Sequence, residues 1–491
     1  MFCATDPFSV RPLSYFGRQN FVAVASEADA ISTLPVVGDE VDFGFAADLV
    51  LNLPPAPGRT VFRAVHRLPA AHTVLLGLER TSLRRYWSLD PTRQVFFPSD
   101  GDYADAFREK LTVAVSRRLE GDQPVASVLS GGLDSSSVTA LAAEVNRSRH
   151  RPRPLALSVQ FDCFPECDER GFQRLVVEKY GLDHLVAQLA EPHATDDLRE
   201  ALAWLGTPDL ASGHWITARV ASLTAASGAR VLLTGAGGDR VVSHGEQTLD
   251  ELAASRQWRH FLREVAARSS SSRRRLRMML VGAIRGTLPH WVPKLFDGPL
   301  GGPNQGFDLV TRRALAASSL VSLWEEAWAD AKVAVPPSRW FHWCRLNARD
   351  VRWDLDMSER LCSRLGVEPR HPFYDRELVE FCLALPGTQK RRGQITRYVA
   401  TQAAAREVPA AILQRPSKTG FNSVHRRMTA PVLRRRFEDA YHLERLAPWV
   451  RARPLRRLHE RFISDRWKHS YPLLFEAWRV ALLSYWLNRF C

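Results

Sequence analysis

The chain has 491 residues, of which 45% are hydrophobic and 24% charged, proportions that fit a folded protein of two or three domains and exclude wholesale disorder. Its best apolar run, residues 278–284, ends at Arg285 and is too short to cross a bilayer, so we expect no membrane-spanning helix. The first twelve residues lack the basic and apolar stretches of a secretion signal, and the seven cysteines are scattered. We therefore expect a reduced, cytoplasmic protein.

Basic residues outnumber acidic residues by 67 to 53, which gives a formal net charge of +14. Two interpretations of this excess stay open. One is a partner such as nucleic acid, anionic lipid or an acidic peptide, and the other is a general enrichment in arginine on solvated faces. Only seven of the 67 basic residues are lysine, which leaves sixty arginines. A lysine inside a motif is therefore informative in this chain.

Residues 1–95 alternate short apolar runs with turn residues, which predicts a small, mainly β region. We expect strands at residues 21–26, 60–65 and 72–78. From about residue 102 the apolar spacing becomes helical, and a second region begins there.

The second region alternates apolar strands with helices, a pattern typical of an α/β fold with a doubly wound parallel sheet. The strands are expected at residues 125–130, 154–161 and 229–235. Helices are expected at residues 135–145 and 170–181. After about residue 245 the chain is predicted to be mainly helical to its end.

The strongest motif is the segment Ser-Gly-Gly-Leu-Asp-Ser-Ser at residues 130–136, between a predicted buried strand and a predicted helix. Glycines let the backbone approach a ligand closely, and the N-terminus of a helix favours an anion. The serine hydroxyls add donors, and Asp134 can hold a magnesium ion that bridges phosphates. An ordinary connection rich in small residues is the alternative, but five suitable residues in this position favour a phosphate site. It is not a Walker loop, because it lacks Gly-Lys-Ser/Thr.

A second glycine-rich turn follows another predicted strand, in the segment Leu-Thr-Gly-Ala-Gly-Gly-Asp at residues 233–239. It places a second carboxylate, Asp239, at the carboxyl edge of the same sheet, where open α/β sheets bind ligands. Asp134 and Asp239 could then share one magnesium ion. Taken alone, Asp239 is also explained as a turn aspartate that bonds the local backbone.

Two further segments lie in the helical part, Gly-Val-Glu-Pro-Arg-His-Pro-Phe-Tyr-Asp at residues 366–375 and Arg-Pro-Ser-Lys-Thr-Gly-Phe at residues 415–421. In this order, the four segments resemble the motifs of the asparagine synthetase B family, whose members bind ATP in a pyrophosphatase-type PP-loop. The resemblance covers roughly residues 100–425. It implies an ATP-binding α/β domain that adenylates a carboxylate and releases pyrophosphate.

The resemblance assigns roles to individual residues. It implies that magnesium binds to Asp134 and Asp239, that Lys418 stabilises pyrophosphate and the charged transition state, and that Glu368 deprotonates the attacking amine. Taken singly, Lys418 is also explained as a solvated lysine and Glu368 as a partner of Arg370. The residues implied to hold ATP are Leu129, Ser130, Gly131, Gly132, Asp134, Ser135, Ser136, Val159, Thr234 and Gly235.

The N-terminal region resembles the back half of the family's glutaminase domain, in the segments 6–13, 25–27, 67–69 and 85–87. In the family, the nucleophile of glutamine hydrolysis is an N-terminal cysteine. The only nearby cysteine, Cys3, follows Phe2 and does not occupy that position, and the glutamine-binding front half has no counterpart. We expect a truncated, degenerate glutaminase-like domain without glutaminase activity, unless the true start of the protein lies upstream.

These observations predict two domains. The first is the glutaminase-like domain at residues 1–95. The second is the ATP-binding domain at residues 100–491, with an α/β core at 100–245 and a mainly helical part at 246–491.

The second glycine-rich turn departs from the pattern of the asparagine-forming members, because Ala236 replaces their glutamate and Arg240 follows Asp239. A methyl group in place of a large polar side chain enlarges the pocket, which favours a bulkier substrate than aspartate and ammonia. The resemblance thus implies an ATP-dependent carbon–nitrogen ligase, with lasso-peptide macrolactam cyclisation as its specific role.

Ammonia-dependent asparagine synthesis and a non-catalytic binding module are the alternatives. The implied partners are a peptide or amino-acid substrate, a leader-peptide-binding protein and a leader peptidase. Neither nucleic acid nor a membrane is among them.

Overall fold

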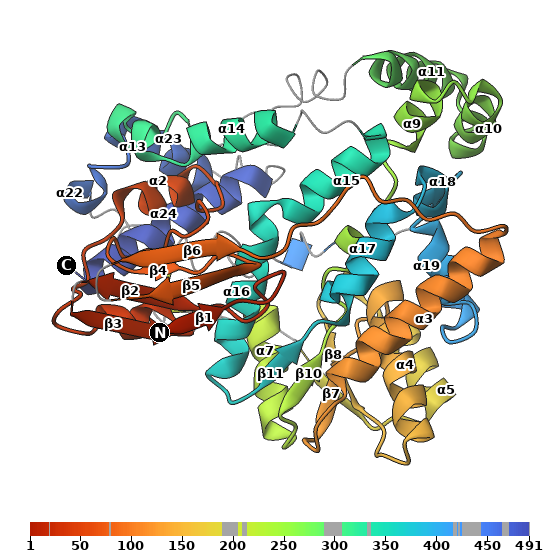
Figure 1. Cartoon of the computed structure of the whole chain (residues 1–491), viewed down its shortest axis with the longest axis horizontal. Helices are drawn as coiled ribbons and strands as arrows, with labels where there is room; N and C mark the ends of the chain where they lie inside the picture. Colours follow the sequence, from red (N-terminus) through yellow and green to blue (C-terminus); the bar gives the residue numbers. More distant parts are fainter. Residues whose placement is uncertain are drawn as a thin grey trace.

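In the computed structural model, the residues described are 1–18, 20–77, 80–188, 205–208, 214–288, 307–330, 335–415, 420, 423–424, 443–463 and 471–490. They form a mixed α/β structure with a small β region on one side and a parallel sheet covered by helices on the other (Figure 1). The predicted fold class, a parallel α/β sheet with a helical C-terminal part behind a small β region, is confirmed.

The N-terminal region contains two small antiparallel sheets. Two helices, α1 (Ala28–Ser32) and α2 (Phe43–Val50), follow the third strand. The strands predicted at residues 21–26 and 72–78 are β3 and β5. The first sheet has the order β1 (Phe2–Ala4), β5 (His72–Leu76), β6 (Thr81–Arg85), and the second has the order β3 (Phe21–Ala25), β2 (Ser14–Arg18), β4 (His66–Arg67).

The strand predicted at residues 60–65 is wrong, because this stretch makes only an isolated bridge and turns instead. The cause is Thr60, whose hydroxyl contacts the carbonyl oxygens of Phe62 and Val65 at 3.0 and 2.8 Å. These local side-chain contacts compete with a strand ladder. The chain pairs only afterwards, in β4.

The second sheet region is a five-stranded parallel sheet. Its order is β11 (Glu368–Arg370), β10 (Val231–Leu233), β7 (Val125–Val128), β8 (Leu155–Gln160), β9 (His184–Gln188). The chain runs outward from β7 to β9 and then returns to β10 on the other side of β7. The carboxyl ends of β7 and β10 therefore flank the topological switch point, where such sheets bind ligands.

Helices cover both faces of this sheet, as expected for a doubly wound fold (Figure 1). One group comprises α3 (Asp100–Arg118), α4 (Leu133–Ser148) and α5 (Arg170–Tyr180), and α7 (His214–Ala226) and α16 (Arg349–Ser363) lie on the other side. The start of α3 is fixed by a capping box, in which Ser99 and Asp102 satisfy each other's backbone N–H groups.

The remaining structure is mainly helical, as predicted for the C-terminal part. None of the helices within the described ranges is both long enough and apolar enough to span a membrane. These remaining elements are α8 (Gly238–Val242), α9 (Thr248–Ala254), α10 (Trp258–Arg268), α11 (Ser272–Thr287), α13 (Arg312–Ala317), α14 (Leu320–Asp330), α15 (Pro337–Asn347), α17 (Arg376–Ala384), α18 (Gly387–Lys390), α19 (Tyr398–Ala403), α20 (Ala410–Leu413), α22 (Leu443–Leu446), α23 (Ala452–Ile463), α24 (Tyr471–Phe490) and the short strands β12 (Arg391–Arg392) and β13 (Ile395–Thr396).

The C-terminal helix α24 returns to the N-terminal region and packs beside α2 (Figure 1). Trp486 on α24 is fully buried, its ring centre lies 6.0 Å from that of Phe62, and its indole N–H donates to the carbonyl oxygen of Gly206. Burial of a tryptophan removes a large apolar area from water. The two ends of the chain therefore share one hydrophobic core.

Ion pairs also join the N-terminal region to α16. The carboxylate of Asp356, which is 1% exposed, lies 2.5 Å from Arg67 Nη1 on β4 and 3.4 Å from Arg360 Nε. Burial alone would raise the pKa of Asp356, but these two guanidinium groups hold it below its usual value. The charges are thus compensated across the boundary between the regions.

Replacement of Asp356 by alanine should destabilise the protein strongly, because two largely buried arginines would lose their shared carboxylate. We expect the free energy of unfolding to fall by about 3–5 kcal/mol, measured by urea unfolding followed by circular dichroism. The matched control is Glu40→Ala, which removes an ion pair with Arg63 whose side chains are 70% and 69% exposed and should change stability little. Equal unfolding curves for the two variants would contradict this interpretation.

Candidate active site

The two predicted glycine-rich turns lie against each other at the switch point between β7 and β10. A side chain at Gly235 would place its Cβ 2.6 Å from the backbone nitrogen of Ser135, and a side chain at Gly238 would overlap the carboxylate of Asp134. Only glycine permits this close approach. The two segments that sequence alone singled out therefore form one continuous surface.

The turn at residues 130–136 is held by its own serines. The hydroxyl of Ser135 accepts a hydrogen bond from the backbone N–H of Ser130 at 3.1 Å and lies 2.9 Å from the hydroxyl of Ser130. Gly131 has a φ of +85°, which favours glycine, and Gly132 is the N-cap of α4. The turn is thus rigid and leads directly into the N-terminus of a 16-residue helix, a place that favours an anion.

Ser136, in the first turn of α4, is fully buried, and its hydroxyl has no hydrogen-bond partner within the described part of the chain. An unpaired buried hydroxyl costs free energy unless a ligand or water satisfies it. An oxyanion at the start of α4 would supply an acceptor for such a donor. This observation fits the predicted phosphate site.

Asp134 and Asp239 converge on one cation, the guanidinium group of Arg397. Arg397 Nη1 lies 2.6 Å from Asp134 Oδ2 and 2.7 Å from Asp239 Oδ1, and the side chains of Arg397 and Asp134 are 12% and 13% exposed. The imidazole of His244 lies 3.6 Å from Asp239, and burial lowers its pKa. The structure therefore brings the two predicted metal ligands together.

These carboxylates fit a magnesium ion, which prefers oxygen ligands and commonly binds one or two carboxylates together with substrate phosphates. No group of three or more His, Cys, Asp or Glu side chains suited to a metal occurs among the residues that the structure describes. Asp134 and Asp239 are thus suited to share a metal with a phosphate group rather than to enclose it.

Arg397 is a site residue that sequence reasoning missed. It lies between β13 and α19, and its backbone adopts a left-handed conformation with a φ of +53°. A non-glycine residue in this region is uncommon, and such strain persists only where the surrounding structure holds it in place. With sixty arginines in the chain, its residue type gave no signal, and the backbone conformation is visible only in the structure.

The residues predicted near the nucleoside lie at the ends of neighbouring strands. Leu129 is buried and its carbonyl oxygen accepts from the hydroxyl of Ser158 at 2.6 Å, while Val159 follows on β8. Thr234 begins the second turn, and its hydroxyl lies 2.6 Å from Nδ1 of His371. Burial lowers the pKa of His371 to about 4, so its ring is neutral at pH 7.

Glu368 lies apart from this cluster. It begins β11, opposite Val231, and is thus at the amino end of a strand whose carboxyl end faces the two turns. Its carboxylate accepts from Arg370 Nε and Nη2 at 2.9 Å and pairs with Arg11 of the N-terminal region. These two arginines, Arg370 foremost, hold the pKa of Glu368 below its usual value. The role of Glu368 as a base stays a prediction.

Lys418 lies outside the described residues. The nearest described residues, Arg415 and Gly420, contact residues beside the first turn. Arg415 pairs with Glu169 at 2.6 Å, and the thiol of Cys167 donates to the carbonyl oxygen of Gly420 at 3.4 Å. A side chain on Gly131 would touch the carbonyl oxygen of Glu169. The role predicted for Lys418 is untested.

Comparison with models of known protein families shows which family the chain belongs to. The family model for asparagine synthase matches residues 106–488, which is most of the chain. The chain belongs to the asparagine synthase family. A second model, for a glutamine amidotransferase domain, matches residues 1–87 and covers both N-terminal sheets. The resemblance inferred from the motifs is confirmed at the level of the family, whose members use ATP.

Individual relatives agree with this assignment. The chain is 23% identical to glutamine-hydrolysing asparagine synthetase 3 of Bacillus subtilis over 453 aligned residues. These residues are 87% of this chain and 65% of the relative. It is 32% identical to amidase chyE of Penicillium rubens over 196 residues, 37% of this chain and 29% of the relative. It is 29% identical to amidase chry2 of Gibberella zeae over 259 residues, 49% of this chain and 37% of the relative. The chain thus spans about two thirds or less of each relative's length.

Proposed function

We propose that this protein is an ATP-dependent ligase that joins a carboxylate to an amine, with AMP and pyrophosphate as the other products. The observation that carries the proposal is the contact between the two glycine-rich turns, which brings Asp134 and Asp239 onto one cation above the N-terminus of α4. Family membership supports the same reaction class. A non-catalytic binding module would not need this convergence of charges.

The proposed reaction has two steps. An oxygen of the substrate carboxylate attacks the α-phosphorus of ATP, and the bond to the β,γ-phosphates breaks, which gives an acyl adenylate and pyrophosphate. The amine nitrogen then attacks the acyl carbon, loses a proton and expels AMP. Both steps develop negative charge on phosphate oxygens, and preorganised cations and N–H groups stabilise such charge.

In this reaction, different residues would bind the phosphates, the nucleoside and the metal. The backbone of residues 130–136 and the hydroxyl of Ser136 would bind phosphate oxygens, and Thr234 and Val159 would lie near the nucleoside. Asp134 and Asp239 would hold magnesium, which when bound neutralises phosphate charge. Lys418 would place a flexible cation near the departing pyrophosphate.

The surroundings of the second turn bear on the substrate. Ala236 is exposed and small, and the nearby Arg240 is turned toward α16, where it donates to both carboxylate oxygens of Asp350 at 2.9 Å. Ala236 contributes only a methyl group here, and Arg240 is directed away toward α16. This supports a substrate bulkier than aspartate, and our specific proposal is macrolactam formation in a lasso-type peptide. Ammonia-dependent asparagine synthesis is the second candidate.

We further propose that residues 1–95 act without glutaminase chemistry. Cys3 is the middle residue of β1, an edge strand of the first small sheet, where it pairs with Val74 of β5. A thiol within a paired strand is not presented as a terminal nucleophile. The amine would then come directly from the substrate, and a leader-peptide-binding protein and a leader peptidase would be its partners.

The two interpretations of Glu368 predict different results for Glu368→Gln. Its ion pairs with Arg370 and Arg11 favour a structural role, so we expect amide formation to fall less than about threefold while the thermal midpoint falls. Activity assays and thermal unfolding of the same sample measure both. A loss of amide formation by 100-fold or more, with ATP–pyrophosphate exchange retained, would instead establish Glu368 as the base.

The proposed reaction class is tested by its products. We would incubate the protein with magnesium, ATP, and either aspartate with ammonia or candidate peptides that carry a free N-terminus and an acidic side chain. Chromatography should show AMP in amounts equal to the amide formed. Formation of ADP instead of AMP would contradict the proposal.

A further inference from the structure

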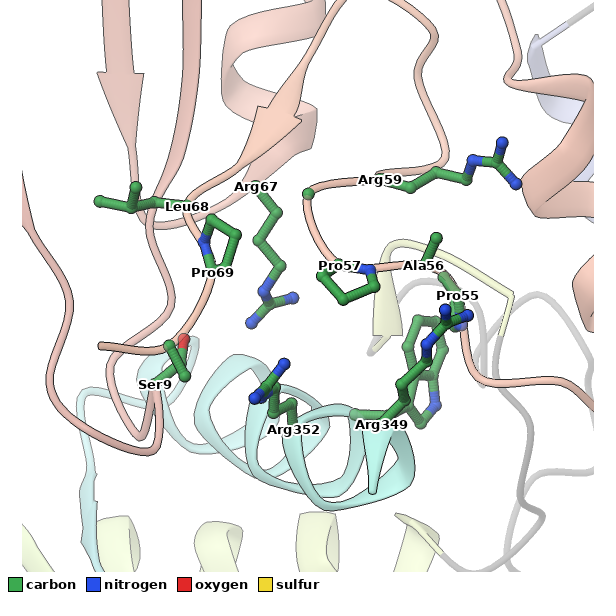
Figure 2. Close-up of a pocket in the computed structure, with 13 residues that line it drawn as sticks. Ser9, Pro55, Ala56, Pro57, Arg59, Arg67, Leu68, Pro69, Arg349 and Arg352 are labelled. Atoms are coloured by element: carbon green, nitrogen blue, oxygen red, sulfur yellow. The ribbon is translucent and has the colours of Figure 1, made fainter. Parts of the chain in front are cut away.

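A small pocket lies between the N-terminal region and the start of α16 (Figure 2). One wall is formed by Ser9 and by residues 55–59 and 67–70, and the other by residues 349–353 of α16. Its volume is about 50 Å³, whereas one water needs at least about 10–15 Å³. The pocket therefore has room for a few waters or for one phosphate or carboxylate group, and a nucleotide is too large for it. None of its wall residues belongs to the two glycine-rich turns.

Three buried polar atoms on these walls have no hydrogen-bond partner in the described part of the chain. They are the hydroxyl of Ser9, Nη2 of Arg67 and Nη1 of Arg349. Ser9 is 1% exposed and the side chain of Arg349 is 5% exposed. Guanidinium nitrogens only donate hydrogen bonds, and a buried donor without an acceptor destabilises the protein. A hydrogen-bond acceptor bound in the pocket would satisfy all three donors.

The pocket also contains one arginine, Arg352, whose positive charge has no ion-pair partner among the described residues. Arg67 and Arg349 are paired through their other nitrogens with Asp356 and Glu326, but Arg352 makes no ion pair with any described residue. Arg352 is partly buried and points toward Arg67 from the opposite wall (Figure 2). Burial and the neighbouring guanidinium groups lower its pKa. An anion between these arginines would remove that repulsion.

We propose that this pocket binds an oxyanion, a phosphate or a carboxylate group, at a site separate from the ATP site. The planar forks of the arginines match two oxygens of such a group, and the hydroxyl of Ser9 supplies a further donor. The positive end of α16 favours the same sign of charge. Either free phosphate or a carboxylate of a small molecule satisfies these requirements.

The pocket is connected to the candidate active site through the first turn of α16. Arg349 lines the pocket, and the next residue, Asp350, holds Arg240 with two hydrogen bonds of 2.9 Å. Arg240 itself follows Asp239. An anion that orders the start of α16 therefore also fixes the segment that carries one of the two site carboxylates.

The test is a calorimetric titration of the full chain with inorganic phosphate and, separately, with acetate, at constant ionic strength in a chloride buffer. Saturating non-hydrolysable ATP analogue with magnesium is present, so that the ATP site is filled. We expect saturable binding of one anion, weakened at least tenfold by Arg352→Gln and less than twofold by the control Arg63→Gln. The probe that binds with the higher affinity, phosphate or acetate, identifies the preferred chemical group.

Arg352→Lys provides a second variant should the glutamine variant not fold. This variant keeps the positive charge but loses the planar guanidinium that can donate two parallel hydrogen bonds. We expect its affinity for the anion to fall about threefold to fivefold. The proposal is overturned if neither probe binds saturably, which would mean that the pocket holds water only. It is also overturned if the folded Arg352 variants bind as tightly as the unchanged protein, or if an anion that binds in a parallel titration without the ATP analogue no longer binds when the analogue is present.

Discussion

Replacement of Asp134 by asparagine is expected to lower the rate of ATP–pyrophosphate exchange by about 100- to 1,000-fold. The substitution keeps the shape of the side chain and removes its charge. In the structure, Asp134 shares Arg397 with Asp239 and lies against Gly238, so its carboxylate is fixed where the two turns meet. Without that charge, the site has one carboxylate left to hold magnesium.

The control for this prediction is Asp122→Asn, because the side chain of Asp122 is fully exposed and its nearest ion-pair partner is 3.7 Å away. We expect that variant to retain full exchange activity. Circular dichroism should show that both variants fold, since Arg397 keeps Asp239 as a partner when Asp134 is changed. Exchange within threefold of the unchanged protein in Asp134→Asn would contradict the assignment of the metal site.

Replacement of Lys418 by alanine is expected to reduce ATP-dependent amide formation by about 100- to 1,000-fold, because it removes the cation that we propose stabilises the developing charge of pyrophosphate. Lys418→Arg should recover only part of the activity, since a guanidinium is planar and differs in reach from an ammonium. Rates of AMP release with the same substrate measure both effects.

Lys179→Ala is the matched control for Lys418. Lys179 is an exposed lysine that donates to the carbonyl oxygen of Arg406, and its removal should leave the rate unchanged. Both variants should have the thermal midpoint of the unchanged protein. If Lys418→Ala forms amide at the normal rate, the role inferred from its motif is wrong.

The fold was largely predictable because its signals are local in sequence. Apolar runs bounded by turns predicted β7, β8 and β10, helical spacing predicted α4 and α5, and the parallel sheet follows from that alternation. The strand at residues 60–65 failed because a single hydroxyl, that of Thr60, redirects the backbone. Hydrophobic pattern does not report such a contact.

The candidate site was predictable where it depends on short motifs and not where it depends on distant contacts. The two glycine-rich motifs predicted that both turns lie at the carboxyl edge of one sheet. The direct contact of Gly235 and Gly238 with the first turn is visible only in the structure. Arg397 comes from a segment more than 150 residues away from Asp239, and the arginines of the pocket beside α16 come from two regions. In a chain with sixty arginines, only tertiary structure separates these few from the rest.

The base role given to Glu368 shows the opposite difficulty. Its motif matched the family pattern, yet its neighbours in space are Arg11 and Arg370, and its position is the amino end of β11. A motif fixes the residue type and the strand, whereas the ion pairs that set its pKa depend on how the N-terminal region packs. Sequence spacing could not supply that information.

The most direct test of the proposed function is isotopic exchange between radiolabelled pyrophosphate and ATP, with magnesium and the panel of carboxylate substrates. Reversible adenylation predicts that label enters ATP only when a carboxylate is present, and that exchange ceases when magnesium is chelated. Amine is not needed for this half-reaction. Absence of exchange with every carboxylate, by protein that is folded and binds ATP, would contradict the assignment of this chain as an adenylating ligase.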